Sequence, residues 1–345
     1  MSKLLKSVFY GTMQATGLFE LTRRLNANKA LILTYHGVLE TGSENYVNRN
    51  CVSKDMFEKQ MLWLKNNYNP VHLSDLVEML QGKKKMPPHA VAVTFDDGFH
   101  NNYKVAFPVL EKHNVPATIF VTTDFINTKG EQLWTERIDS IIYSATILRL
   151  RLPIDGEDGL FDISTPENKI KSSDRIRKIL KSQSRRERER HILLLEQQIE
   201  GVREFIDEMD ERYAFLQWQD IAAMVKSGII EIGSHTCSHS ILSTLTHEEV
   251  KTELLNAKMA IEAQLAMPCK LFSYPNGTPK DFSRRDKNIL QELGYAAAFS
   301  QIDGLNSVGE DVYALKRINI VRSANFAFFL SKITGIWGKI KRILN

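Results

Sequence analysis

The stretch that decides the fold is Ala90-Val91-Ala92-Val93-Thr94-Phe95-Asp96-Asp97-Gly98. Its apolar and β-branched residues predict a buried strand of the kind found in parallel sheets. The strand ends abruptly in two adjacent carboxylates and a glycine. Two neighbouring acids are costly to bury unless a cation or a proton compensates them. An isolated Asp-Asp-Gly sequence is most typical of a solvated turn, so a functional interpretation requires partners elsewhere in the chain.

Six further short apolar runs are separated by segments with helical signals. They cover residues 30–37, 116–123, 229–235, 271–275, 295–299 and 315–320. This alternation predicts parallel βα units. Polar residues follow several of the runs: His36, Asp96 and Asp97, His235, and the turn at 274–277. In a βα barrel such tips converge on one mouth, so the pattern favours a barrel over an open doubly wound sheet.

The composition changes between residues 133 and 213, where a mainly helical insertion is predicted. The barrel is expected over residues 30–132 and 214–325. Residues 1–29 and 326–345 are predicted to contain an N-terminal and a C-terminal amphipathic helix, because apolar residues recur at helical spacing beside lysines and arginines. Such helices either bind an anionic membrane surface peripherally or dock on the body of the protein, and both interpretations remain open.

The bulk composition limits the class of partner and the compartment. A net charge of +4 over 345 residues, without a basic stripe interleaved with aromatic residues, argues against nucleic-acid binding. Three cysteines without paired spacing fit a reducing compartment. Neither a signal peptide nor a membrane-spanning run is expected, so we expect a cytoplasmic protein, with contact at the inner face of the membrane as an option.

A second motif supplies partners for the acidic strand. Gly233-Ser234-His235-Thr236-Cys237-Ser238-His239 places two histidines at positions i and i+4. On a helical turn this spacing puts both imidazoles on one face, which is a common arrangement for chelating zinc. Two imidazoles and one carboxylate make three protein ligands and leave a coordination position open for water. Cys237, midway between the histidines, is expected to point away.

The two motifs together resemble the polysaccharide deacetylase family of metal-dependent carbohydrate esterases. Tyr35-His36-Gly37-Val38 is similar to the opening strand of a bacterial subset of that family. The resemblance covers about residues 30–125 and 215–320, and it implies a distorted (β/α)7 barrel. It also implies that Asp97, His235 and His239 bind one divalent metal and that Asp96 is the general base. This ligand set suits zinc first, with cobalt, nickel or iron as alternatives.

The third motif of the family, an Arg-Pro-Pro-Tyr-Gly type turn, reads Ser273-Tyr274-Pro275-Asn276-Gly277 here. The resemblance implies that Tyr274, Asn276 and Gly277 contact the substrate, with the backbone N–H of Asn276 as the oxyanion donor. Ser273 replaces the family's arginine. Arg317, on the last predicted strand, is a candidate replacement for that positive charge, and a surface ion pair is the alternative.

The fifth motif departs further, because residues 315–320 lack the histidine that family members often use as general acid. His36, at the tip of the first strand, is the candidate for that role, and a hydrogen-bonded rim histidine is the alternative.

The leading functional hypothesis is a hydrolase of carbon–nitrogen bonds other than peptide bonds. The resemblance implies that it removes N-acetyl groups from an N-acetylated sugar or glycan precursor, in the assembly of a cell-surface glycan. One alternative is an enzyme of the same fold that opens a ring amide or deformylates a sugar. Another is a degenerate barrel that binds glycan without turnover.

Overall fold

The computed structural model describes residues 10–13, 15–41, 50–154, 157–200, 213–323 and 325–336. Its centre is a parallel sheet whose order is β11-β10-β9-β6-β5-β1-β12. These strands are β1 (Leu31–Tyr35), β5 (Ala90–Phe95), β6 (Ala117–Val121), β9 (Ile230–Ser234), β10 (Leu271–Ser273), β11 (Ala297–Phe299) and β12 (Ile318–Asn319). All seven predicted strands are present, and each pairs in parallel with its neighbours. The two-residue strand β4 (Asn69–Pro70) adds to β5.

The sheet curls until its two edges approach each other. Leu315, just before β12, forms a parallel bridge with Phe299 of β11. The backbone N–H of Ser300 also donates to the carbonyl of Leu315 at 2.8 Å. A bridge, not a full strand pair, therefore closes the ring. This arrangement confirms the expected distorted (β/α)7 barrel.

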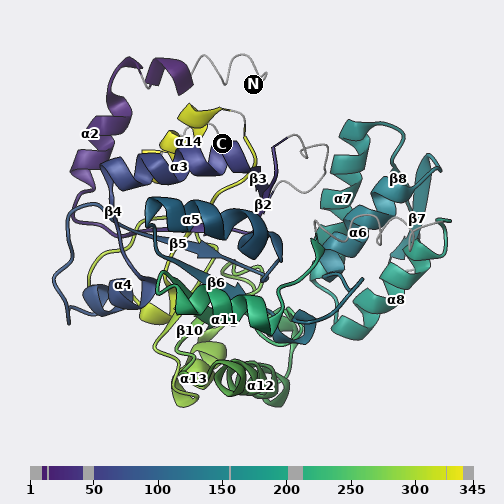
Figure 1. Ribbon diagram of the computed structural model, residues 1–345. Helices are drawn as coiled ribbons and strands as arrows, with labels where there is room; N and C mark the ends of the chain where they lie inside the picture. Colours follow the sequence, from purple (N-terminus) through teal and green to yellow (C-terminus); the bar gives the residue numbers. More distant parts are fainter. Residues whose placement is uncertain are drawn as a thin grey trace.

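Helices cover the outside of the sheet (Figure 1). They are α3 (Lys54–Asn67), α4 (Leu73–Leu80), α5 (Phe107–His113), α11 (Trp218–Lys226), α12 (His247–Leu265) and α13 (Arg284–Glu292). A capping box begins α12, because the side chains of Thr246 and Glu249 each accept a hydrogen bond from the other residue's backbone N–H. A short parallel pair, β2 (Gly37–Leu39) and β3 (Cys51–Ser53), lies after the tip of β1.

The insertion between β6 and β9 lies to one side of the barrel, on the right in Figure 1. It contains α6 (Trp134–Ser144), β7 (Arg149–Ile154), β8 (Glu157–Asp162), α7 (Pro166–Lys181) and α8 (Arg185–Glu196). Its buried apolar residues form a cluster separate from those of the barrel. The antiparallel β7–β8 hairpin was not predicted. An ion pair between Lys181 and Asp281, at 2.9 Å, joins the insertion to the barrel.

Two terminal helices, α2 (Leu18–Leu25) and α14 (Phe326–Ile333), meet at their C-terminal ends, where Asn26 donates to Thr334 O at 3.1 Å. Met13 is buried, and α14 buries Phe329, Leu330 and Ile333 against the core. These apolar residues therefore dock on the body of the protein. The predicted helical residues at 1–9 and 337–345 lie outside the described residues.

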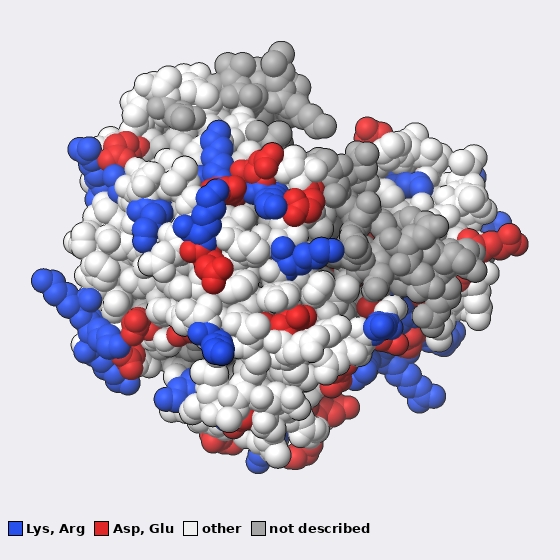
Figure 2. All heavy atoms as spheres, in the orientation of Figure 1, with Lys and Arg blue, Asp and Glu red and all other residues white. Residues whose placement is uncertain are grey.

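Charged side chains of both signs are interspersed over the face shown in Figure 2. Basic side chains gather at the lower left of that view, and elsewhere acidic and basic side chains alternate. No helix among the described residues is both long and apolar enough to cross a bilayer.

Candidate active site

The two acids and the first histidine extend neighbouring strands of the sheet. The backbone N–H of Asp96 donates to Tyr35 O at 3.0 Å, so Asp96 continues the ladder between β1 and β5. Asp97 then has a positive φ of 78°, which turns the chain out of the strand. His235 continues the β6–β9 ladder through its N–H, which donates to Val121 O at 2.9 Å. Strand geometry therefore brings these groups to one end of the barrel.

Asp97, His235 and His239 form a buried cluster. One ligand atom from each residue lies within 4.8 Å of the other two. The Oδ1 atom of Asp97 lies 3.4 Å from Nε2 of His235 and 3.3 Å from Nε2 of His239. The three residues are at most 8% exposed. The structure thus brings together the three predicted metal ligands.

The cluster fits a tetrahedral ion. Zinc bonds of about 2.0–2.1 Å at tetrahedral angles separate neighbouring ligand atoms by about 3.3 Å, close to the distances observed here. Nδ1 of His235 lies 2.7 Å from Ser273 O, so this nitrogen carries the proton and Nε2 faces Asp97. Asp97 Oδ1 is buried and has no hydrogen-bond partner among the described residues. A cation between these atoms would satisfy all of them.

The histidine loop is not the helical turn that the i, i+4 spacing predicted. Residues 235–240 are irregular, with positive φ at Thr236 (66°) and His239 (56°). Even so, the two imidazole rings meet with centroids 5.0 Å apart. Glu253 of α12 holds the loop in place, since its carboxylate accepts hydrogen bonds from the N–H groups of Cys237 and Ser238 at 3.0 and 3.1 Å.

Asp96 is braced by Arg317, whose side chain is fully buried. The two terminal nitrogens of Arg317 donate to the two carboxylate oxygens of Asp96, at 2.8 and 2.7 Å. Arg317 also donates to Ser300 O, to the hydroxyl of Thr94 and to the hydroxyl of Ser273. Arg317 is therefore an interior partner of Asp96 and not part of a surface ion pair.

The charges around the site set the protonation of its acids. Burial raises the pKa of Asp96, but the guanidinium of Arg317 and the imidazole of His235 outweigh it, so the pKa lies below its ordinary value. Burial likewise raises the pKa of Asp97, and the two adjacent imidazoles lower it well below the ordinary value. Both carboxyl groups are therefore ionised near neutral pH, as a metal ligand and a general base require.

Of the three residues expected in the oxyanion turn, only Asn276 keeps a donor available. The hydroxyl of Tyr274 donates to Tyr313 O, its ring stacks on Phe282, and its N–H donates to Phe299 O. Tyr274 was expected to contact the substrate, but its side chain is part of the core. The N–H of Gly277 donates to Pro275 O at 2.7 Å.

Asn276 has a positive φ of 60°. Within the described part of the chain its backbone N–H makes no hydrogen bond, and its side-chain Nδ2 is buried without a partner. The turn therefore offers one backbone donor for an anionic oxygen.

His36 lies near both acids at the tip of β1. Its charge is among the factors that lower the pKa values of Asp97 and Asp96, after burial and the partners already named. Its backbone carbonyl accepts a hydrogen bond from Asn102 at 2.7 Å. Its Nδ1 is buried and has no hydrogen-bond partner among the described residues. The ring is therefore not held by the hydrogen bond that a rim histidine would make through this nitrogen.

Two polar residues near the site were missed from the sequence. Gln301 donates from Nε2 to Asp96 Oδ2 at 3.1 Å. Glu136 of α6 is 5% exposed, and burial together with the charge of Asp97 raises its pKa to about 8. No motif marks either residue, because each reaches the site through a loop or insertion whose position only the fold determines.

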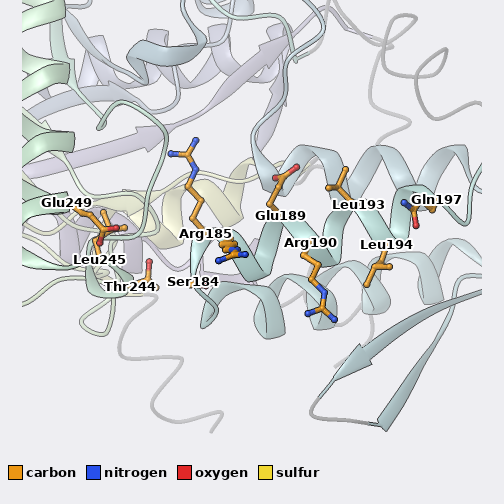
Figure 3. Close-up of a pocket in the computed structure, with 11 residues that line it drawn as sticks. Ser184, Arg185, Glu189, Arg190, Leu193, Leu194, Gln197, Thr244, Leu245 and Glu249 are labelled. Atoms are coloured by element: carbon orange, nitrogen blue, oxygen red, sulfur yellow. The ribbon is translucent and has the colours of Figure 1, made fainter.

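One cavity lies away from these residues. It has a volume of about 740 Å³ and lies between α8 and residues 244–249 (Figure 3). Its walls include Arg185, Arg190 and Leu193, and none of the lining residues belongs to the Asp97 cluster. The cavity therefore has no part in the chemistry assigned below.

Comparison with known proteins agrees with this geometry. The family model for polysaccharide deacetylase matches residues 83–144 and 189–298, which together make up about half of the chain. A poly-beta-1,6-N-acetyl-D-glucosamine N-deacetylase of Staphylococcus aureus is 33% identical over 115 residues, covering 30% of this chain and 39% of that protein. The Bacillus subtilis protein YxkH is 37% identical over 102 residues, covering 29% of this chain and 34% of that protein. The matched stretches thus span well under half of either relative.

Solved structures share the fold. The Streptococcus pyogenes deacetylase PplD superimposes with a TM-score of 0.58 at 19% identity, over 88% of this chain and 98% of that one. IcaB from Ammonifex degensii gives 0.57 at 18% identity, over 88% and 97%. Together with the sequence matches and the two motifs at the mouth of the barrel, these similarities show that the chain belongs to the polysaccharide deacetylase family.

Proposed function

We propose that the protein is a metal-dependent hydrolase that removes N-acetyl groups from N-acetylated amino sugars. The observation that carries the proposal is the buried Asp97–His235–His239 cluster next to an ionised Asp96 that Arg317 holds in place. A mixed imidazole–carboxylate set suits zinc first, with cobalt, nickel or iron as alternatives.

The residues of the site divide the reaction among them. Asp97, His235 and His239 would hold a divalent ion, which when bound would polarise the acetamide carbonyl and lower the pKa of a water. Asp96 accepts a proton from the attacking water. The backbone N–H of Asn276 donates to the oxygen that becomes negative. When the carbon–nitrogen bond breaks, His36 gives a proton to the leaving amine, so that acetate and a free amino sugar result.

Arg317 has a positioning role in this scheme. Its two parallel hydrogen bonds fix the plane of the Asp96 carboxylate, and its charge keeps Asp96 ionised. The family's arginine is absent from residues 273–277, and Arg317, immediately before β12, supplies an equivalent charge.

The substrate class follows from the relatives. One of them is named for deacetylation of poly-beta-1,6-N-acetyl-D-glucosamine. We propose an N-acetylglucosamine glycan or its precursor as substrate here, with a role in the assembly of a cell-surface glycan.

The test is acetate release from β-1,6-linked N-acetylglucosamine oligomers by zinc-loaded protein. Chelator and Asp96→Asn should each abolish release, and zinc should restore it after chelation. His247→Ala, an exposed substitution at the start of α12, is the matched control. Turnover of a ring amide or a formylated sugar alone would contradict the deacetylase proposal. Stoichiometric metal binding without turnover of any amide would instead indicate a glycan-binding barrel.

A further inference from the structure

We propose that Glu253 is a positioning residue for the metal centre, and that it sets the affinity of the site for its ion through the loop that carries His239. The proposal rests on the metal-dependent function proposed above. Glu253 lies on α12, and its carboxylate reaches the site indirectly, through residues 237–240.

The two histidine ligands are held in different ways. Nδ1 of His235 lies 2.7 Å from Ser273 O, which fixes the orientation of that ring. Nδ1 of His239 is buried and has no hydrogen-bond partner among the described residues. Metal-binding histidines usually donate from this second nitrogen to an acceptor. The direction of the His239 ring therefore depends on the backbone that carries it.

That backbone is strained. Thr236 and His239 have positive φ values of 66° and 56°, and Thr236 is β-branched, a residue type that rarely adopts this region. Thr236 is also fully buried, and its hydroxyl has no hydrogen-bond partner in the described part of the chain. Such a loop persists only where the contacts around it impose its conformation.

Glu253 supplies these contacts on one side of the loop. Its Oε2 atom accepts hydrogen bonds from the N–H groups of Cys237 and Ser238, at 3.0 and 3.1 Å. Its Oε1 atom accepts one from the hydroxyl of Ser238 at 2.6 Å. Hydrogen bonds to a carboxylate are stronger than those between neutral groups. On the other side of the loop, the N–H of Asp124 donates to Cys237 O at 2.9 Å, so the loop is clamped between α12 and the chain that leaves β6.

A salt bridge does not account for the position of Glu253. Arg185 of α8 lies 4.0 Å from its carboxylate, and the arginine side chain is 67% exposed, so this pair contributes little. The shorter contacts of Glu253 go to the loop. Loss of the carboxylate should therefore release the strained backbone, move the His239 ring away from Asp97 and weaken metal binding.

The experiment is a competitive chelator titration of the full chain with zinc. Glu253→Gln keeps the length and helix propensity of the side chain, but it places an amide N–H donor against donors of the loop. We expect this variant to weaken zinc binding about tenfold, and Glu253→Ala to weaken it by up to about 100-fold. Glu248→Gln is the matched control, because Glu248 is an exposed glutamate on the same helix, and this variant should bind zinc as the wild type does.

Further measurements separate positioning from folding. Circular dichroism of the chelated Glu253→Gln protein should show the helix content of the wild type. In cobalt-loaded protein the visible absorption of a tetrahedral ion should weaken in this variant, whereas a purely structural role would leave the spectrum of the folded protein unchanged. In a double-mutant cycle, Ser238→Ala should weaken zinc binding less in the Glu253→Gln background than in the wild type.

A zinc affinity of Glu253→Gln equal to that of the wild type would overturn the positioning role and leave the metal site intact. Additive effects of Glu253→Gln and Ser238→Ala would show that Glu253 does not act through the loop. Failure of the wild type to bind zinc would overturn the metal-dependent function, and this inference with it.

Discussion

Replacing Arg317 with methionine removes the charge that compensates Asp96 while keeping a side chain of similar length. In the wild type the guanidinium is fully buried and makes hydrogen bonds to Asp96, Thr94, Ser273 and Ser300. Removing one partner of a buried ion pair costs about 3–5 kcal/mol, because the other charge is left without compensation. We therefore expect Arg317→Met to lower the free energy of unfolding by about this amount.

A double-mutant cycle with Asp96→Asn separates the charge pair from general packing. Asp96→Asn alone should also destabilise, because it leaves Arg317 charged and unpaired in the interior. The double variant contains neither charge, so it should be more stable than the sum of the two single effects predicts. We expect a coupling energy of at least about 2 kcal/mol.

The assay is urea unfolding at pH 7 in the presence of chelator, so that metal binding does not contribute. The pH dependence gives a second check. Since the folded pKa of Asp96 is lowered, the stabilisation is present above its unfolded-state pKa and is lost as the pH falls through the folded value. Additive single effects, or a cost below about 1 kcal/mol for Arg317→Met, would refute the charge-pair reasoning.

Three further outcomes follow from other contacts. Burial raises the pKa of Glu136 to about 8, so the free energy of unfolding falls as the pH rises from about 4.5 to 8. In urea unfolding at pH 8 with chelator present, Glu136→Gln should therefore raise the free energy of unfolding by up to about 4 kcal/mol. An unchanged free energy of unfolding would contradict this. Gly277→Ala should lower the free energy of unfolding by about 1–3 kcal/mol, because φ is +61° and the new Cβ would lie 2.8 Å from Gln301 N. Gly228→Ala is the control and should lower it less, because φ is +79° there but no atom lies within 4 Å of the new Cβ. His239→Ala should weaken zinc binding at least 100-fold in a competitive chelator titration, and an affinity near wild type would remove this histidine from the ligand set.

The seven strands were predictable because each is a short apolar run between segments with helical signals, and several of the runs end in polar residues. The β7–β8 hairpin was missed although its signal is present in the sequence. In Arg149-Leu150-Arg151-Leu152 the two leucines are buried and Arg149 and Arg151 are exposed, a period of two that predicts a strand. The surrounding helical composition concealed this short alternation.

The candidate site was predictable wherever a motif carried it. Asp97, His235 and His239 were identified from sequence and lie together, but the helical turn assumed for the histidines was wrong. Glu253, whose carboxylate shapes that loop, lies on α12 without any distinguishing pattern. Its effect depends on how α12 packs, which local sequence does not encode. Tyr274 is the opposite case. It belongs to a motif and was expected to contact the substrate, but its side chain is buried in the core and its hydroxyl donates to Tyr313 O.

The pairing of Asp96 with Arg317 constrains the order in which the molecule can be completed during translation. Asp96 precedes β6, and Arg317 immediately precedes β12, close to the end of the chain. A nascent polypeptide therefore exposes the acid long before its cationic partner leaves the ribosome. Before Arg317 has been synthesised, a hydrated Asp96 carboxylate is more stable than a buried one. We therefore expect the barrel to close late. A product truncated before Leu315 would lack both the bridge that closes the ring and the cationic partner of Asp96.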